Sequence, residues 1–180
     1  MTIAAGRHEL GPDDGTVAVR THCTGAAAKA GHDLLLHVTA WRAEIEIADD
    51  GAPASVVFEA DATSFRVIEG TGGIQALGDD DRASIVQTID EEILGRSTIA
   101  FRSTAIEPVA GGTARVHGEL TLAGATAPLV VELSADGDGL RARATVVQTS
   151  FGLKPYSALF GALKVADDVE VTIDATPAPS

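Results

Sequence analysis

Apolar and polar residues alternate with a period of two along most of this chain. Seven segments show the pattern, and it is clearest at residues 115–122, 140–148 and 169–174. Successive side chains of a β-strand point to opposite faces, so the alternation predicts strands that each have one apolar face. Seven such strands must cover one another's apolar faces, which predicts a β-barrel or a β-sandwich.

The connections between these segments predict how the strands pair. In the second half, glycine-containing turns at residues 111–112, 123–124 and 136–139 separate the strands. Turns this short make consecutive strands antiparallel neighbours. In the first half, the apolar face changes parity between Val38 and Trp41, which predicts a β-bulge or a sharp bend between them.

One segment, residues 79–94, has helical periodicity instead. Ile85, Ile89 and Ile93 recur every four residues and form one apolar stripe. Asp79 is a candidate N-cap, the aspartates after it suit the positive end of the helix dipole, and a glycine directly follows the segment. We expect this amphipathic helix to cover one open end of a barrel.

Length and composition indicate a single domain. The chain has 180 residues, enough for one sizeable core, and no internal repeat or linker divides it. Residues 1–15 are polar and form an N-terminal extension, residues 16–175 form the barrel domain, and the Pro/Ala-rich residues 176–180 form a flexible tail.

Charge and cysteine content narrow the function classes. The net charge of −13 argues against a nucleic-acid partner, which needs clustered Lys and Arg. The single cysteine, Cys23, excludes an intrachain disulfide and a CxxC site. The N-terminus lacks a signal-peptide pattern, and no apolar run approaches the ~20 residues of a membrane span. We therefore expect a cytoplasmic protein with no integral membrane association.

The residues expected to face inward are uncharged, and several are small. Ala and Gly at these positions leave volume that Leu or Phe would otherwise fill, and an apolar cavity suits a long hydrocarbon. Alternatively, the small residues reflect an alanine-rich chain, and larger neighbours fill the space. The predicted lumen residues are Phe58, Ala60, Ile99, Phe101, Val116, Gly118, Leu120, Leu129, Val131, Ala142, Ala144 and Val146.

The segment at residues 150–164 breaks the alternation and gathers aromatic residues in a chain with only 4% of them. Pro155 cannot donate a ladder hydrogen bond, so the segment is a connection rather than a central strand. It is either a lid whose aromatic side chains contact a ligand or a plug that fills the end of the barrel. The predicted lid and entrance residues are His32, Phe151, Lys154, Tyr156 and Phe160.

Candidate catalytic and metal-binding residues do not assemble into a site. His32 and His37 face opposite sides of one strand and cannot bind the same ion, while His117 is expected on the outer face. No HExxH, GxSxG, P-loop or complete GxGxxG motif occurs. We predict structural or surface roles for these histidines, with no metal, no cofactor and no catalytic residue.

Several segments together resemble the YceI-like family of lipocalin-like barrels: residues 29–34, 118–124 followed by Pro128, 148–153 and 164–171. The resemblance extends from about residue 16 to residue 175. It implies an all-β fold, an eight-stranded antiparallel lipocalin-like β-barrel with one amphipathic helix covering an end. It also implies that the lumen holds a polyisoprenoid chain. His32 and Phe151 match the early histidine and the late aromatic–glycine motif of the family.

We therefore expect the protein to bind and sequester or carry a long apolar amphiphile, most of all a polyisoprenoid lipid, in the barrel lumen. Apolar burial of about 25 cal/mol per Å² would drive binding. The alternative is an enzyme that cyclises or modifies an apolar substrate in the same lumen, which needs His32, Asp33, Lys154 or Tyr156 on the wall. A third hypothesis is an interaction module with a vestigial cavity. The sequence leaves open whether the chain forms a homodimer.

Overall fold

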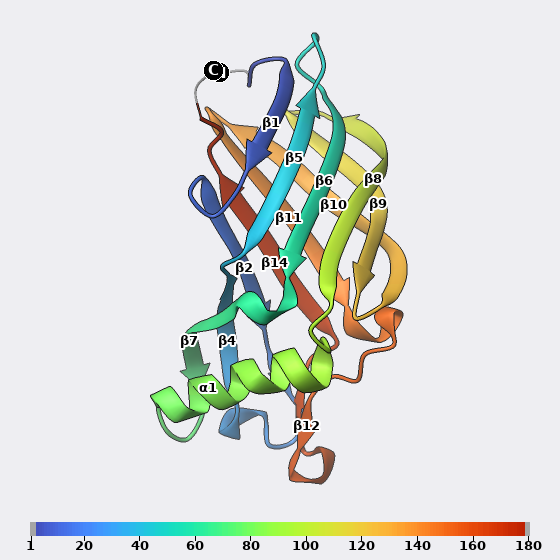
Figure 1. The fold of residues 1–180 in the computed structure, drawn as a ribbon. Coiled ribbons are helices and arrows are strands. Elements are labelled where there is room, and N and C mark those ends of the chain that lie inside the picture. The colour runs from blue at the N-terminus through green and yellow to red at the C-terminus, as the bar shows by residue number, and fades with distance from the viewer. Residues whose placement is uncertain (1–2, 179–180) are drawn as a thin grey trace.

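The structure is a computed structural model that describes residues 3–178, and it consists mostly of β-structure (Figure 1). Eleven antiparallel strands form one sheet, which curls strongly into a half-barrel. These strands are β1 (Gly6–Leu10), β2 (Gly15–Thr21), β4 (His32–Val38), β5 (Trp41–Ile47), β6 (Pro53–Asp61), β7 (Phe65–Gly72), β8 (Thr98–Val109), β9 (Thr113–Leu122), β10 (Ala125–Asp136), β11 (Gly139–Val147) and β14 (Asp168–Ala175).

A second, small sheet lies at one end of the molecule (Figure 1). Its hydrogen-bonded order is β12 (Ser157–Ala158), β13 (Leu163–Val165) and β3 (Cys23–Thr24). Short 3₁₀ turns complete the connections: η1 (Ala28–Ala30), η2 (Ala62–Ser64), η4 (Gln148–Phe151) and η5 (Leu159–Gly161). Segments far apart in the sequence therefore meet at this end.

The strand pairing confirms the mostly β fold with its antiparallel neighbours but does not show an eight-stranded barrel. The order in the large sheet is β1-β5-β6-β8-β9-β10-β11-β14-β2-β4-β7. Two long stretches of strand are each interrupted once, β4 to β5 at residues 39–40 and β6 to β7 at η2. The interruptions lie side by side, because Thr39 N donates to Ser64 O at 3.0 Å and Asp61 N donates to Ala40 O at 3.0 Å. The predicted bend between Val38 and Trp41 is thus confirmed.

The N-terminal extension contributes a strand that the sequence analysis did not predict. β1 pairs with β5 over its whole length, and Leu10 at its end is buried. Arg7 on β1 forms an ion pair with Glu44 on β5. Three consecutive polar residues obscure the alternation in this strand, which explains why the pattern missed it. Residues 1–2 of the extension and 179–180 of the tail lie outside the described residues.

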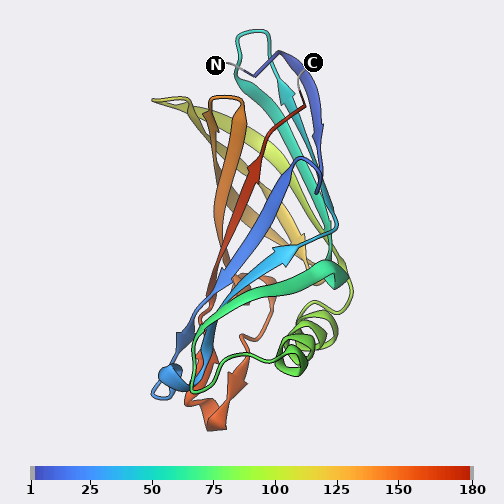
Figure 2. The ribbon, with the colours of Figure 1, turned by 90° about the vertical axis from the view of Figure 1, so that its left-hand side faces the viewer.

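The helix predicted at residues 79–94 is present and crosses one end of the curled sheet (Figures 1 and 2). It comprises α1 (Asp79–Thr88) followed by one π-helical stretch, η3 (Ile89–Ile93). The N-cap is Gly78 rather than Asp79, and the Asp81 carboxylate accepts a hydrogen bond from Gly78 N at 2.9 Å. The three aspartates in its first turn suit the positive end of the helix dipole.

Candidate ligand-binding site

A cavity of about 560 Å³ lies inside the curl of the large sheet. This volume is within the range of roughly 300–1,000 Å³ that small-molecule sites usually have. Its walls come from the inward faces of most strands of the large sheet and from the helix. Because alternate residues of each strand point inward, the period-two pattern of the sequence supplies these walls directly.

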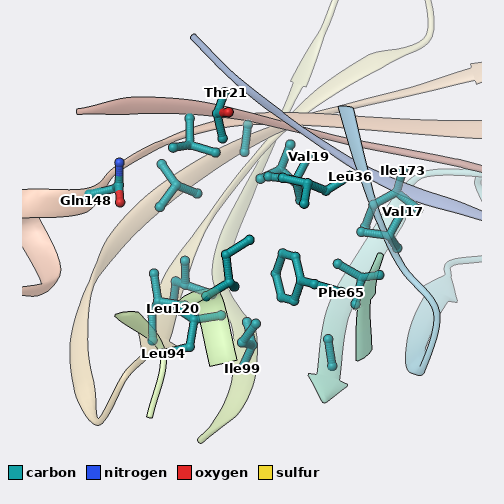
Figure 3. A pocket seen from close by; sticks show the side chains of 18 of the residues that line it. Val17, Val19, Thr21, Leu36, Phe65, Leu94, Ile99, Leu120, Gln148 and Ile173 are labelled. Carbon is teal, nitrogen blue, oxygen red and sulfur yellow. The ribbon is translucent and has the colours of Figure 1, made fainter. Parts of the chain in front are cut away.

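The lining is predominantly aliphatic and aromatic, as the close view in Figure 3 shows. Leu94, Ile99 and Leu120 face the cavity from one side, and Val19 with Leu36 faces it from the other. The ring of Phe65 projects between these walls (Figure 3). Buried apolar side chains without hydrogen-bonding groups can bind hydrocarbon but cannot orient a sugar or a nucleotide.

Uncharged polar side chains border the cavity mainly toward the end where the helix and the small sheet lie. Thr21 ends β2, and Gln148 begins η4 (Figure 3). Ser84 and Thr88 on α1 also line the cavity, as does Tyr156 before β12. Gln148 is buried, and its side-chain amide donates to Ala166 O at 3.0 Å. The cavity therefore has an apolar interior and one end that can receive a polar group.

His32 forms part of this polar end. It lines the cavity, and its Nε2 lies 2.7 Å from the carbonyl oxygen of Gln75 in the loop before the helix. A side chain at Gly73, where φ is +75°, would collide with the same imidazole. The ring is thus held against the backbone of the loop that connects β7 to α1.

Cys23 also borders the cavity at this end. Its Sγ donates to His32 O at 3.2 Å, and its backbone N donates to the Asp33 carboxylate at 2.7 Å. Burial raises the pKa of the Cys23 thiol, and the negative charge of Asp33 raises that pKa further. A raised pKa keeps the thiol protonated, so the environment of Cys23 does not favour a nucleophile.

The structure places most of the predicted lumen residues on the cavity wall. Of the predicted lid and entrance residues, His32 and Tyr156 also line the cavity. The lumen residues that border the cavity are Phe58, Ala60, Ile99, Phe101, Leu120, Leu129, Val131, Ala142, Ala144 and Val146.

Two predicted lumen residues do not border the cavity. Val116 has only 1% of its surface exposed and packs into the hydrophobic core. Gly118 is covered by the ring of Phe101, since a Cβ at Gly118 would lie 2.5 Å from Phe101 Cζ. The inward parity of both residues is right, but the large side chains around them fill the space in front of them.

Three predicted lid residues also lie away from the cavity. Phe151 is buried in the core within η4, so it fills the structure as the plug hypothesis expected. Lys154 is exposed to solvent. Phe160 is fully exposed, and its backbone adopts φ +54°. Instead, Leu153 and Lys164 of this segment line the cavity.

Many lining residues were not named from the sequence, although their strands were predicted. The parity of β2, β4 and β14 was available to identify them. Phe65 gave no such signal, since the chain bends at η2 immediately before it. The additional aliphatic residues include Val17, Val19, Leu34, Leu36, Val38, Ile85, Ile89, Ile93, Leu94, Val169, Val171 and Ile173.

Residues 3–178 contain neither a cluster of metal-ligating side chains nor a membrane-spanning helix. No group of three or more His, Cys, Asp or Glu side chains in this part of the chain could hold a metal ion. Within the same residues, no helix is long and apolar enough to cross a membrane.

Several solved structures have a fold similar to that of this chain. The crystal structure of Burkholderia cenocepacia BcnA superposes with a TM-score of 0.66 at 16% sequence identity, covering 92% of this chain and 97% of that chain. A mutant of the Campylobacter jejuni YceI protein with a monobromobimane guest gives a TM-score of 0.60, and another crystal structure of that protein gives 0.59. Both share 10% identity and cover 81% of this chain and 85% of theirs.

Sequence comparison identifies the family. No curated protein matches the chain. The family model of the YceI-like domain matches residues 16–176, which is most of the sequence. The chain therefore belongs to the YceI-like domain family.

Proposed function

We propose that this protein binds and carries a long apolar amphiphile in the cavity of the curled sheet, with its tail inside and its polar group at the helix end. The distribution of uncharged polar side chains carries the proposal: most of the wall is aliphatic and aromatic, while Thr21, His32 and Gln148 lie toward one end. Two charged residues, Glu44 and Arg143, border the cavity elsewhere. YceI-like proteins are generally binding proteins rather than enzymes, which supports binding over catalysis.

A polyisoprenoid lipid is the ligand that we favour. Its branched tail would contact aliphatic side chains on all sides, and each Å² of apolar surface that it buries contributes about 25 cal/mol. The cost of ordering a flexible chain reduces this gain, so affinity depends on how much of the tail the cavity encloses. Counting β4–β5 and β6–β7 as single bent strands leaves nine strands, and the eight besides β1 would form a barrel around such a tail.

The enzyme hypothesis is less well supported. Of its four candidate titratable residues, His32 and Tyr156 border the cavity, whereas Asp33 and Lys154 do not. Asp33 is engaged by the backbone N of Cys23 at 2.7 Å. The favoured function therefore assigns no proton transfer and no covalent step to the cavity.

Native mass spectrometry of the protein purified from its host tests this proposal. We expect a bound mass that is lost on denaturation and extracts into organic solvent as a prenyl lipid. The variant Ala144→Trp places a large side chain in the cavity and should abolish binding. Val130→Trp is the matched control, because Val130 lies next to inward-facing Leu129 and Val131 but is itself exposed. The proposal would be contradicted if the Ala144→Trp variant still carried the bound mass, or if the apo protein failed to take up prenyl lipids.

A further inference from the structure

Two of the three lysines of this acidic chain lie at the end of the molecule with the small sheet, and the third lies in the connection that leads into that sheet. The sequence contains Lys29, Lys154 and Lys164 and no other lysine, against 26 acidic residues. Lys164 lies on β13, whose neighbours are β12 and β3, and Lys29 lies on η1, which directly follows β3 in the chain. All three side chains are exposed, and none forms an ion pair within residues 3–178.

An apolar turn projects from the same end. η5 connects β12 to β13, and it extends beyond α1 in both views (Figures 1 and 2). Leu159 is 57% exposed, and Phe160 is fully exposed. Both adopt positive φ values, +51° and +54°, which cost L-residues roughly 1–2 kcal/mol each. The backbone is thus strained in a conformation that leaves two large apolar side chains in solvent.

Lys29, Lys164 and the turn belong to one continuous structure, which we call the lip: β3, η1, β12, η5 and β13. Lys154 lies in the connection between η4 and β12 that leads into it. Ala27 N next to η1 donates to Ala162 O next to η5 at 2.8 Å, which joins its two halves. Residues 23–32 and 150–166, which contain the lip, include no Asp or Glu. The lip therefore contains lysines and no acidic residue on a molecule whose net charge is −13, and the Asp33 carboxylate borders it through its hydrogen bond from Cys23 N.

We propose that the lip docks onto an anionic lipid bilayer, with Leu159 and Phe160 inserted at the level of the headgroups. Exposed apolar residues beside lysines are the combination that binds such surfaces. Repulsion from the acidic remainder is weakened by salt, since screening acts beyond about 8 Å in physiological buffer. The aspartates at the start of α1 are set back from the projecting turn (Figures 1 and 2).

A bilayer fits this surface better than a protein partner. The lip presents one protruding turn, and a specific protein interface usually buries at least about 1,200 Å² in total. A shallow insertion into headgroups needs no complementary surface. Tyr156, Leu163 and Lys164 of the lip region also line the cavity, so docking brings the cavity next to the lipid.

Co-sedimentation of the full-length protein with vesicles tests the proposal. We expect binding to vesicles of phosphatidylcholine with about 30% phosphatidylglycerol, a composition that gives a strong negative surface potential. We expect little binding to pure phosphatidylcholine and release of the protein at high salt. Leu159→Ser with Phe160→Ser should reduce partitioning roughly tenfold or more. Each of Lys154→Gln and Lys164→Gln should reduce it about fivefold.

Matched variants at the opposite end serve as controls. Val109→Ser removes an exposed apolar residue near the β8–β9 turn, and Arg115→Gln removes a basic residue on β9; both should bind like the wild type. The vesicles contain no prenyl lipid, and the cavity variant Ala144→Trp should still sediment, so this result is independent of ligand carriage. The proposal would be overturned if the wild-type protein remained in the supernatant or if the Leu159→Ser, Phe160→Ser variant sedimented equally well. Either result would favour a protein as the partner of the lip.

Discussion

Phe101 and Gly118 show how one residue pair shapes the wall of the cavity. Gly118 on β9 lies opposite Ser103 and Leu129 on the neighbouring strands, and the ring of Phe101 covers it. A glycine here allows an aromatic ring to lie flat against the sheet, while the same ring limits the cavity on this side. The small inward residue therefore contributes packing rather than open volume.

Gly118→Ala should destabilise the protein by about 1–3 kcal/mol, because the added Cβ has no room beside Phe101 and the backbone of Arg102. Urea unfolding monitored by circular dichroism measures the change. Gly11→Ala is the control, since the nearest atom to its Cβ is Trp41 O at 3.7 Å. Equal unfolding midpoints for the two variants would show that the ring moves aside without cost.

Cys23 reports on the polar end of the cavity. Because burial and the Asp33 charge both raise its pKa, alkylation by iodoacetamide at pH 8 should be slower than that of a free thiol. Asp33→Asn should speed the reaction by lowering that pKa, and an occupied cavity should slow it, because Cys23 lines the wall. Mass spectrometry of the alkylated protein over time gives the rates. A rate that Asp33→Asn leaves unchanged would refute this assignment of the charge effect.

Among the elements, the junction of β6 and β7 determines where the long hairpin bends. Asp61 ends β6 and caps η2, since its carboxylate accepts from both the N and the Oγ1 of Thr63 at 2.8 Å. Ser64 then bonds back to the backbone of Ala40 at the neighbouring interruption. The bend is thus fixed by side-chain hydrogen bonds from both strands.

Asp61→Asn should reduce stability at neutral pH but not in acid. The hydrogen bond from Thr63 N, followed by that from its hydroxyl, lowers the pKa of the Asp61 carboxyl below its usual value in the folded protein. A lowered folded pKa stabilises the protein above the unfolded value, and the contribution is lost as the pH falls through the folded value. Thermal unfolding from pH 7 to pH 2 should show the two proteins converging at low pH. A constant difference across this range would argue against the charge as its cause.

The sequence predicted the positions of strands and helix better than the orientation of individual side chains. Alternation located the strands of the second half, and the parity change between Val38 and Trp41 identified the bend. β1 was missed because polar residues hide its alternation. The helix was predicted through residue 94, and only the change to π-helical hydrogen bonding in η3 was not. Phe160 was assigned to the ligand, yet it is fully exposed and has a positive φ that a non-glycine residue does not reveal in advance.

For the whole molecule, the strand count differs from the expected eight for two reasons. The breaks at residues 39–40 and at η2 each divide one long strand into two, and the N-terminal extension adds β1, so the pairing runs through eleven strands from β1 to β7. The hydrophobic pattern determines which face is buried, but it does not specify where a ladder is interrupted. The candidate site was nevertheless largely predictable, because inward parity alone selects most of its wall.

If the proposed lipid binds with its headgroup at the helix end, the unequal ends of the cavity would make its affinity depend on the length of its tail. Polar side chains lie toward the helix end, whereas Leu10, Leu133 and Leu140 line the wall near the other end. A tail whose headgroup is held at the first end meets these leucines at the second. Affinity across a series of prenyl alcohols should therefore rise with chain length and then level off. Leu140→Ala should move that plateau to longer chains and Val130→Ala should not, as competition against a fluorescent lipid would measure; an unchanged plateau would exclude selection by length.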